Sequence, residues 1–110
     1  MKICVPVTQD GLVDPRWGRA QRVAVATVGA GRLAGWEEFD VGWGTLHDAG
    51  PEGTHHARVA RFLQEQGAQL VIAEHMGPGM TQMLAKMGIA VRLGASGPAR
   101  DAVVAGTTLT

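Results

Sequence analysis

Hydrophobic and polar positions follow two different periods along this chain, and each period predicts a type of element. Five segments have the length and the aliphatic or β-branched composition of strands: residues 2–7, 21–28, 32–41, 70–73 and 89–93. Three segments repeat hydrophobic residues every three to four positions, as amphipathic helices do: residues 54–66, 79–86 and 98–105. Thr54 has the side chain of a good N-cap, so the first helix is expected to begin there.

The order of these elements predicts a mixed sheet. The Gly29-Ala30-Gly31 turn indicates a hairpin between the second and third strands, which are therefore antiparallel. The later strands alternate with helices, so right-handed crossovers should make them parallel. We expect an α/β fold with a five-stranded mixed sheet flanked by three helices. If the third strand runs parallel to the first, four strands end at one edge, which is where open α/β sheets bind ligands.

Length and charge limit the classes of function. A chain of 110 residues predicts a single domain, residues 1–110. Ten basic residues balance ten acidic ones without a run of either sign, which disfavours nucleic-acid and membrane partners. A strand pattern that starts at residue 2 leaves no room for a signal peptide, so we expect a cytoplasmic protein. The single cysteine, Cys4, excludes an intrachain disulfide and is expected to be a buried, inert thiol. No pattern indicates an oligomeric state.

Four histidines fall on loops or helix starts at the predicted ligand edge. His55 and His56 are expected as the first residues inside a helix, where the positive dipole end disfavours imidazolium. His75 follows the strand at 70–73, and His47 lies in a glycine-rich loop. Neutral imidazole binds transition metals, so these four residues are the predicted metal ligands. The alternative reading is that they are solvated surface histidines.

A second set of residues favours an anion. Arg16 and Arg19 flank Trp17 and can clamp an oxyanion or an anionic cluster. The turns at 77–79 and 94–97 each lead into a helix, whose first N–H groups can cradle an anion. The predicted cofactor-binding set is therefore Arg16, Trp17, Arg19, Gly77, Gly79 and Ser96. The structural alternative for the turns is that tight strand-to-helix connections use glycine in any case.

Five segments together, in this order along the chain, resemble the dinitrogenase iron-molybdenum cofactor biosynthesis family: residues 1–7, 17–20, 77–79, 88–89 and 94–97. That family includes nitrogenase accessory proteins that carry cofactor precursors, and the orange protein, which holds a molybdenum-copper sulfide cluster. The resemblance implies a ribonuclease H-like fold, a metal-sulfur cluster containing molybdenum, iron or copper, and a protein that donates or accepts it. Trp17 replaces the family's usual phenylalanine, and Glu74-His75 replaces glycines. The second change favours a bare transition metal ion instead.

Catalysis is not expected from this sequence. A ribonuclease H-like nuclease needs paired carboxylates for magnesium, one of them in the first strand, and that strand has no acid. Asp10, Asp14 and Glu74 can meet only through loops. We therefore expect a carrier or sensor rather than an enzyme. Two alternatives stay open: a metal-dependent hydrolase, and an interaction module that uses Trp36 or Trp43 as an exposed anchor.

Overall fold

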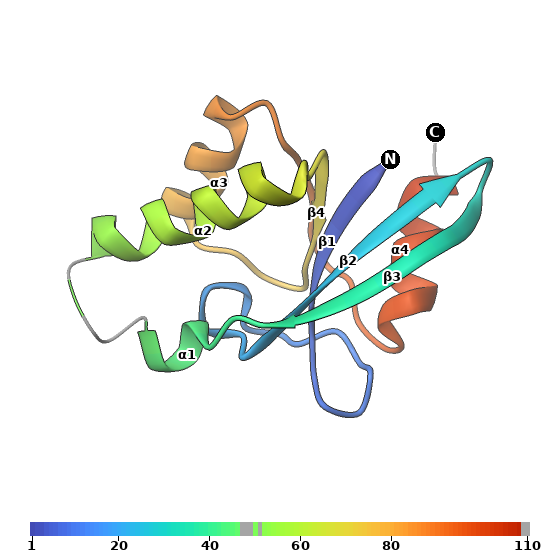
Figure 1. Cartoon of the computed structure of the whole chain (residues 1–110), viewed down its shortest axis with the longest axis horizontal. Coiled ribbons are helices and arrows are strands. Elements are labelled where there is room, and N and C mark those ends of the chain that lie inside the picture. The colour runs from blue at the N-terminus through green and yellow to red at the C-terminus, as the bar shows by residue number, and fades with distance from the viewer. Residues whose placement is uncertain (47–49, 51, 109–110) are drawn as a thin grey trace.

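The computed structural model describes residues 1–46, 50 and 52–108 of the chain, and its centre is a five-stranded mixed sheet (Figure 1). The strands lie in the order β3-β2-β1-β4-β5, with β1 and β2, and β2 and β3, antiparallel. The pairs β1 with β4 and β4 with β5 are parallel. Their bounds are β1 Lys2–Val7, β2 Arg22–Gly29, β3 Arg32–Asp40, β4 Leu70–Ile72 and β5 Ala90–Arg92. The predicted α/β class and mixed sheet are confirmed.

Helices cover both faces of this sheet. Figure 1 shows α2 (Glu52–Gln66) and α3 (Pro78–Lys86) on one side and α4 (Ala99–Thr108) on the other. These three match the predicted helices. Two shorter elements were not predicted, the 3₁₀ helix η1 (Trp17–Arg19) and the single turn α1 (Trp43–Leu46). None of the helices in the described ranges is long and apolar enough to cross a membrane.

The predicted start of α2 at Thr54 is wrong, since the helix already includes Glu52. Glutamate is a favourable residue type in a first helical turn, so the earlier start agrees with the positive end of the helix dipole. His55 is consequently the fourth helical residue rather than one of the first. It therefore lies at the end of the first helical turn, where the dipole argument for its neutrality is weaker than expected.

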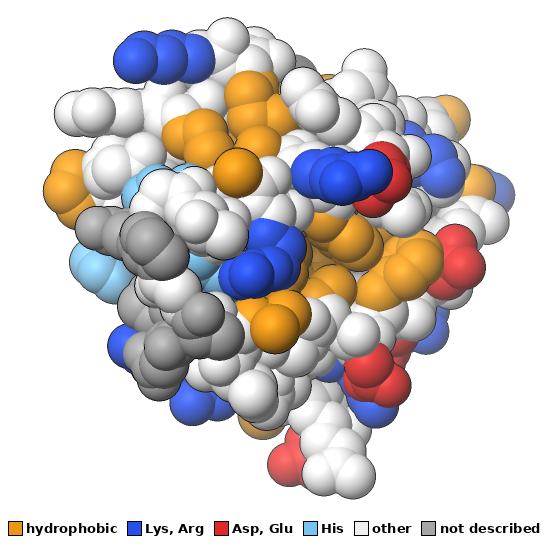
Figure 2. All heavy atoms as spheres, turned by 60° about the vertical axis from the view of Figure 1, so that its left-hand side comes forward, with side chains coloured by type: hydrophobic (Ala, Val, Ile, Leu, Met, Phe, Trp, Pro, Cys, Tyr) orange, Lys and Arg blue, Asp and Glu red, His pale blue; other side chains and the backbone are white. Residues whose placement is uncertain are grey.

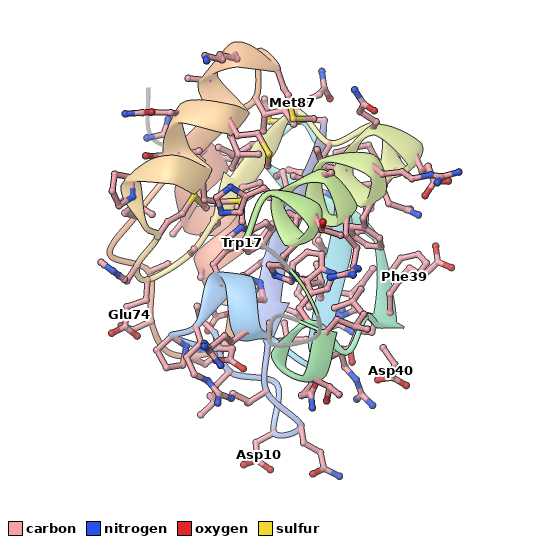
Figure 3. The ribbon with its side chains drawn as sticks, turned by 90° about the vertical axis from the view of Figure 1, so that its left-hand side faces the viewer. Asp10, Trp17, Phe39, Asp40, Glu74 and Met87 are labelled. Carbon is pink, nitrogen blue, oxygen red and sulfur yellow. The ribbon has the colours of Figure 1, made fainter. Side chains whose placement is uncertain are left out.

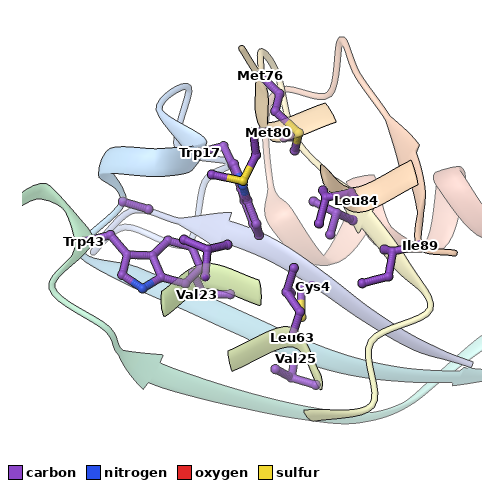
Figure 4. Close-up of a cluster of buried hydrophobic side chains, with 14 residues drawn as sticks. Cys4, Trp17, Val23, Val25, Trp43, Leu63, Met76, Met80, Leu84 and Ile89 are labelled. Carbon is purple, nitrogen blue, oxygen red and sulfur yellow. The ribbon is translucent and has the colours of Figure 1, made fainter. Parts of the chain in front are cut away.

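Strand alternation divides the core into two layers. Along β1, Ile3 and Val5 pack with the residues of α4, whereas Cys4 faces α2 and α3. Cys4 has no exposed surface, as predicted, and burial raises the pKa of its thiol to about 12. The thiol therefore keeps its proton at neutral pH and is a poor nucleophile. Figure 4 shows this residue within the buried cluster on the α2 and α3 side.

Because β3 is antiparallel to β2, it runs parallel to β1, and the carboxyl ends of β1, β3, β4 and β5 meet at one edge as expected. The loops after β1 and β3 are fixed to each other there. Trp43 N–H donates to Ala20 O at 3.0 Å. A Cβ on Gly44 would lie 2.7 Å from Arg19 O, so this contact needs glycine. Trp43 is only 2% exposed, and its prediction as an exposed anchor is wrong because the indole fills this junction.

Candidate functional site

A cavity of about 390 Å³ opens at the predicted edge of the sheet, between the segment around η1, the first turns of α2 and α3, and the loop after β4. Its volume is in the range of ordinary small-ligand sites. Figure 2 shows histidine side chains on one face of the molecule, near a basic side chain. Eight of the ten predicted site residues line this cavity: Arg16, Trp17, Arg19, His55, His56, His75, Gly77 and Gly79.

The other two predicted residues are not brought to this cavity. Ser96 lines a separate hollow of about 550 Å³ with Ile72, Arg92 and Gly106, against α4 on the opposite face of the sheet. Its assignment to the same site as Arg16 is wrong, because the turn before α4 faces the other layer of the core. His47 lies outside the described residues.

Asp14 holds the side chain of Arg16 in place at one side of the cavity. The aspartate is only 4% exposed, and its backbone N–H donates to Pro6 O at 2.9 Å. Its carboxylate accepts hydrogen bonds from Arg16 N at 2.9 Å and Arg16 Nε at 3.2 Å. The hydrogen bond to Asp14, and then the attraction between the two charges, raise the pKa of Arg16. The guanidinium is thus held as a cation beside the cavity, with most of its side chain exposed.

His55 is a buried connector rather than an open imidazole. It is 2% exposed, with Nε2 2.7 Å from Gly18 O and Nδ1 3.0 Å from Arg58 Nη1. A carbonyl only accepts and a guanidinium only donates, so Nε2–H donates to Gly18 and Nδ1 accepts from Arg58. In this arrangement both ring nitrogens are in use. His55 therefore ties α2 to η1, and the sequence pattern did not reveal its partner Arg58, three residues further along the helix.

His56 and His75 are the more accessible imidazoles. His56 is half-buried and touches the start of α3, since a Cβ built on Gly79 would lie 3.1 Å from His56 Cε1. His75 is exposed in the loop that follows β4. In residues 1–46, 50 and 52–108, no three His, Cys, Asp or Glu side chains are grouped so that they could hold one metal ion. The predicted histidines share a cavity without forming a closed ligand set in the described part of the chain.

The cavity lining is basic. It contains two arginines and three histidines, and no Asp or Glu is among the described residues that line it. Figure 3 shows Asp10 and Glu74 well apart from each other, Asp10 at the bottom of the view and Glu74 at its left-hand edge. The first turn of α3 adds backbone N–H groups and the positive end of its dipole. This combination suits an anion better than a bare cation.

Trp17 forms part of the cavity wall and of the core beneath it. Its ring meets Trp43 edge-on, with centroids 5.2 Å apart and an interplanar angle of 73°. The side chain is 2% exposed, and Nε1 has no hydrogen-bond partner in the described structure. Met80 belongs to the stripe of hydrophobic residues along α3 and lies in both the core cluster and the cavity wall. A stripe at helical spacing identifies a core face, but does not reveal that its first member reaches a cavity.

The chain matches the dinitrogenase iron-molybdenum cofactor family over residues 1–107, and it belongs to that family. This confirms the resemblance noted in the sequence. Among solved structures, the apo form of the orange protein from Desulfovibrio gigas is 31% identical, with 97% of this chain and 87% of that chain covered and a TM-score of 0.75.

Two more distant structures share the fold. The crystal structure of PH0822 is 19% identical, with 96% of this chain and 92% of that chain covered and a TM-score of 0.76. The NMR structure of a putative NifB protein from Thermotoga, TM1290, is 22% identical, with 97% and 87% covered and a TM-score of 0.70. No curated protein sequence matches the chain.

Proposed function

We propose that this protein binds an anionic metal-sulfur species in the cavity beside α3 and carries it between a donor and an acceptor protein. The cargo is a cluster or thiometallate that contains molybdenum, iron or copper. The observation that carries the proposal is the basic lining, in which arginines and histidines meet a helix N-terminus with no carboxylate among the described lining residues. Membership of a family named for the iron-molybdenum cofactor supports the same class of cargo.

A sulfide-rich anion suits this lining better than a bare metal ion does. Sulfide ligands accept hydrogen bonds from guanidinium, imidazole and backbone N–H groups, so the protein needs no closed set of metal ligands. A bare divalent cation would instead be repelled by Arg16 and Arg19. His56 and His75 can still contribute, either as donors to sulfide or as direct ligands to an open metal position.

A carrier also accounts for the acidic residues better than a hydrolase does. Asp14 is engaged with Arg16, and neither Asp10 nor Glu74 lines the cavity. Metal-dependent hydrolysis needs carboxylates that converge on a metal and an activated water. The proposal is therefore binding and transfer without turnover.

The test is a calorimetric titration of untagged protein with tetrathiomolybdate, molybdate, zinc, copper and nickel, together with elemental analysis of the protein as purified. Wild type should bind tetrathiomolybdate more tightly than molybdate or any of the free cations. His56→Ala/His75→Ala should weaken that binding by about tenfold, the scale of one or two lost hydrogen bonds to a charged acceptor. Tight zinc binding without thiomolybdate binding would replace the cluster proposal with a metal-ion site. Phosphatase or nuclease turnover lost in Glu74→Gln would replace the carrier with an enzyme.

A further inference from the structure

The indole N–H of Trp17 is a buried donor without a partner in the cavity wall. Among the residues that the structure describes, Trp17 Nε1 is the buried side-chain nitrogen or oxygen atom without a hydrogen bond. The buried polar side chains beside the cavity, Asp14 and His55, are both bonded. A buried N–H without an acceptor costs free energy, so native proteins rarely keep one without a reason.

Packing alone does not account for an indole at this position. The ring contact with Trp43 is an edge-on aromatic contact, which phenylalanine also makes without burying an N–H. Elsewhere in the chain the same group is paired, since Trp36 Nε1 donates to Glu38 Oε2 at 2.9 Å. Trp17 thus differs from Trp36, whose indole nitrogen is paired, and it is the tryptophan that lines the cavity.

The surroundings of Trp17 point to a ligand acceptor. The same cavity is lined by Arg16, His56 and the first turn of α3, so an anion held there lies next to the indole. Figure 4 draws the indole nitrogen of Trp17 close to the Met80 sulfur in this view, and Met80, which is 5% exposed, belongs with Trp17 to the buried cluster and to the cavity lining. Methionine is unbranched and has three rotatable bonds, so its thioether can withdraw and leave the N–H open to the cavity.

We propose that the Trp17 indole N–H is a recognition donor, which hydrogen-bonds a sulfide of the bound anion once Met80 has moved aside. This inference rests on the proposed function, since it requires that the cavity takes an anionic metal-sulfur species. Arg16 and the helix start attract any anion by charge. A neutral N–H instead forms a directional hydrogen bond. It therefore favours a ligand whose acceptor atom reaches the indole at the floor of the cavity.

Trp17→Phe tests this with a small change, because it removes the N–H and keeps an aromatic ring. Trp36→Phe is the matched control, since it makes the same substitution at an indole that lines none of the cavity. In titrations with tetrathiomolybdate, Trp17→Phe should bind about tenfold more weakly than wild type, as expected for one hydrogen bond to a charged acceptor. Trp36→Phe should stay within about twofold of wild type.

A second measurement on wild type keeps the inference testable if Trp17→Phe folds poorly. In ¹⁵N-labelled protein the Trp17 indole resonance should move, and its hydrogen exchange should slow, on saturation with tetrathiomolybdate, while the Trp36 indole stays unchanged. If wild type binds but Trp17→Phe binds equally well, or the Trp17 indole does not respond, the inference is wrong and the proposed function stands. If wild type does not bind tetrathiomolybdate at all, the proposed function fails and this inference fails with it.

Discussion

Two turns of this molecule look equivalent in sequence and differ in what surrounds them. Residues 77–79 and residues 94–97 both follow a parallel strand and lead into a helix. The second turn is covered by the loop after β1. Ala99 N donates to Gly11 O at 2.9 Å, Val13 N donates to Gly97 O at 2.9 Å, and Leu12 forms a bridge with Pro98. The start of α4 is thus already engaged within the chain.

The first turn is open to the basic cavity. Gly77 precedes α3 in an extended conformation and makes no side-chain cap, and Gly79 faces the ring of His56. Arg16 and Arg19 line the same cavity. A helix N-terminus therefore becomes a candidate anion site where neighbouring loops leave it uncovered and supply matching charge. The same helix geometry without those neighbours is only a connection.

Removing the charge beside the open turn should have the largest effect. Arg16→Gln/Arg19→Gln is expected to weaken tetrathiomolybdate binding by about 100-fold, since two charge-assisted contacts are lost, and to reduce its dependence on salt. Glutamine at position 16 can still donate to Asp14, which limits the loss of stability. Arg92→Gln/Arg100→Gln removes the same charge from the α4 side and should bind like wild type. Equal weakening in both double variants would mean that net charge alone attracts the ligand.

Substitutions at the two adjacent histidines should have different effects, one mainly on the stability of the fold and the other mainly on ligand binding. His55→Ala removes a buried ring and leaves Gly18 O without its donor, so we expect the free energy of unfolding to fall by about 2–3 kcal/mol. His56→Ala should cost less than about 1 kcal/mol, because the ring is only half-buried, but should weaken thiomolybdate binding. Urea unfolding and calorimetric titration measure the two quantities. Similar stability losses in both variants would contradict the connector role of His55.

The smallest expected effect comes from adding one methyl group to each turn. In Gly79→Ala the new Cβ lies 3.1 Å from His56 Cε1, so the imidazole must shift, and binding should weaken about threefold with stability nearly unchanged. Gly97 has φ +80°, so Gly97→Ala should cost about 1 kcal/mol of stability through backbone strain. Its affinity for tetrathiomolybdate should match wild type. The opposite pattern would place the ligand at the second turn.

Much of the fold was predictable because strand and helix periods are local properties of the sequence. The hairpin turn and the alternation of strands with helices fixed the mixed sheet and the edge where its strands end. The elements η1 and α1 were missed because three or four residues cannot show a helical period. The start of α2 was missed because Thr54 is a plausible cap by residue type, whereas the true boundary is set two residues earlier.

The sequence could predict which residues of the candidate site lie on loops at the sheet edge, but not how those residues contact one another. Arg16, Trp17 and His75 follow from loops that must reach that edge. Ser96 could not be excluded from sequence, because a glycine turn before a helix does not say whether another loop covers it. The role of His55 depends on Gly18 O, which lies 37 residues away in the chain and contacts the ring only in the folded protein.

The most direct test of the proposed binding site is a chemical-shift map of ¹⁵N-labelled protein titrated with tetrathiomolybdate, since it compares the two turns in one sample. We predict that the backbone amides of residues 16–19, 56 and 75–80 move together and saturate at one equivalent of ligand, while those of residues 94–99 stay in place. Shifts centred on residues 94–99, or small shifts spread over the surface without saturation, would contradict the claim that the cavity beside α3 is the binding site.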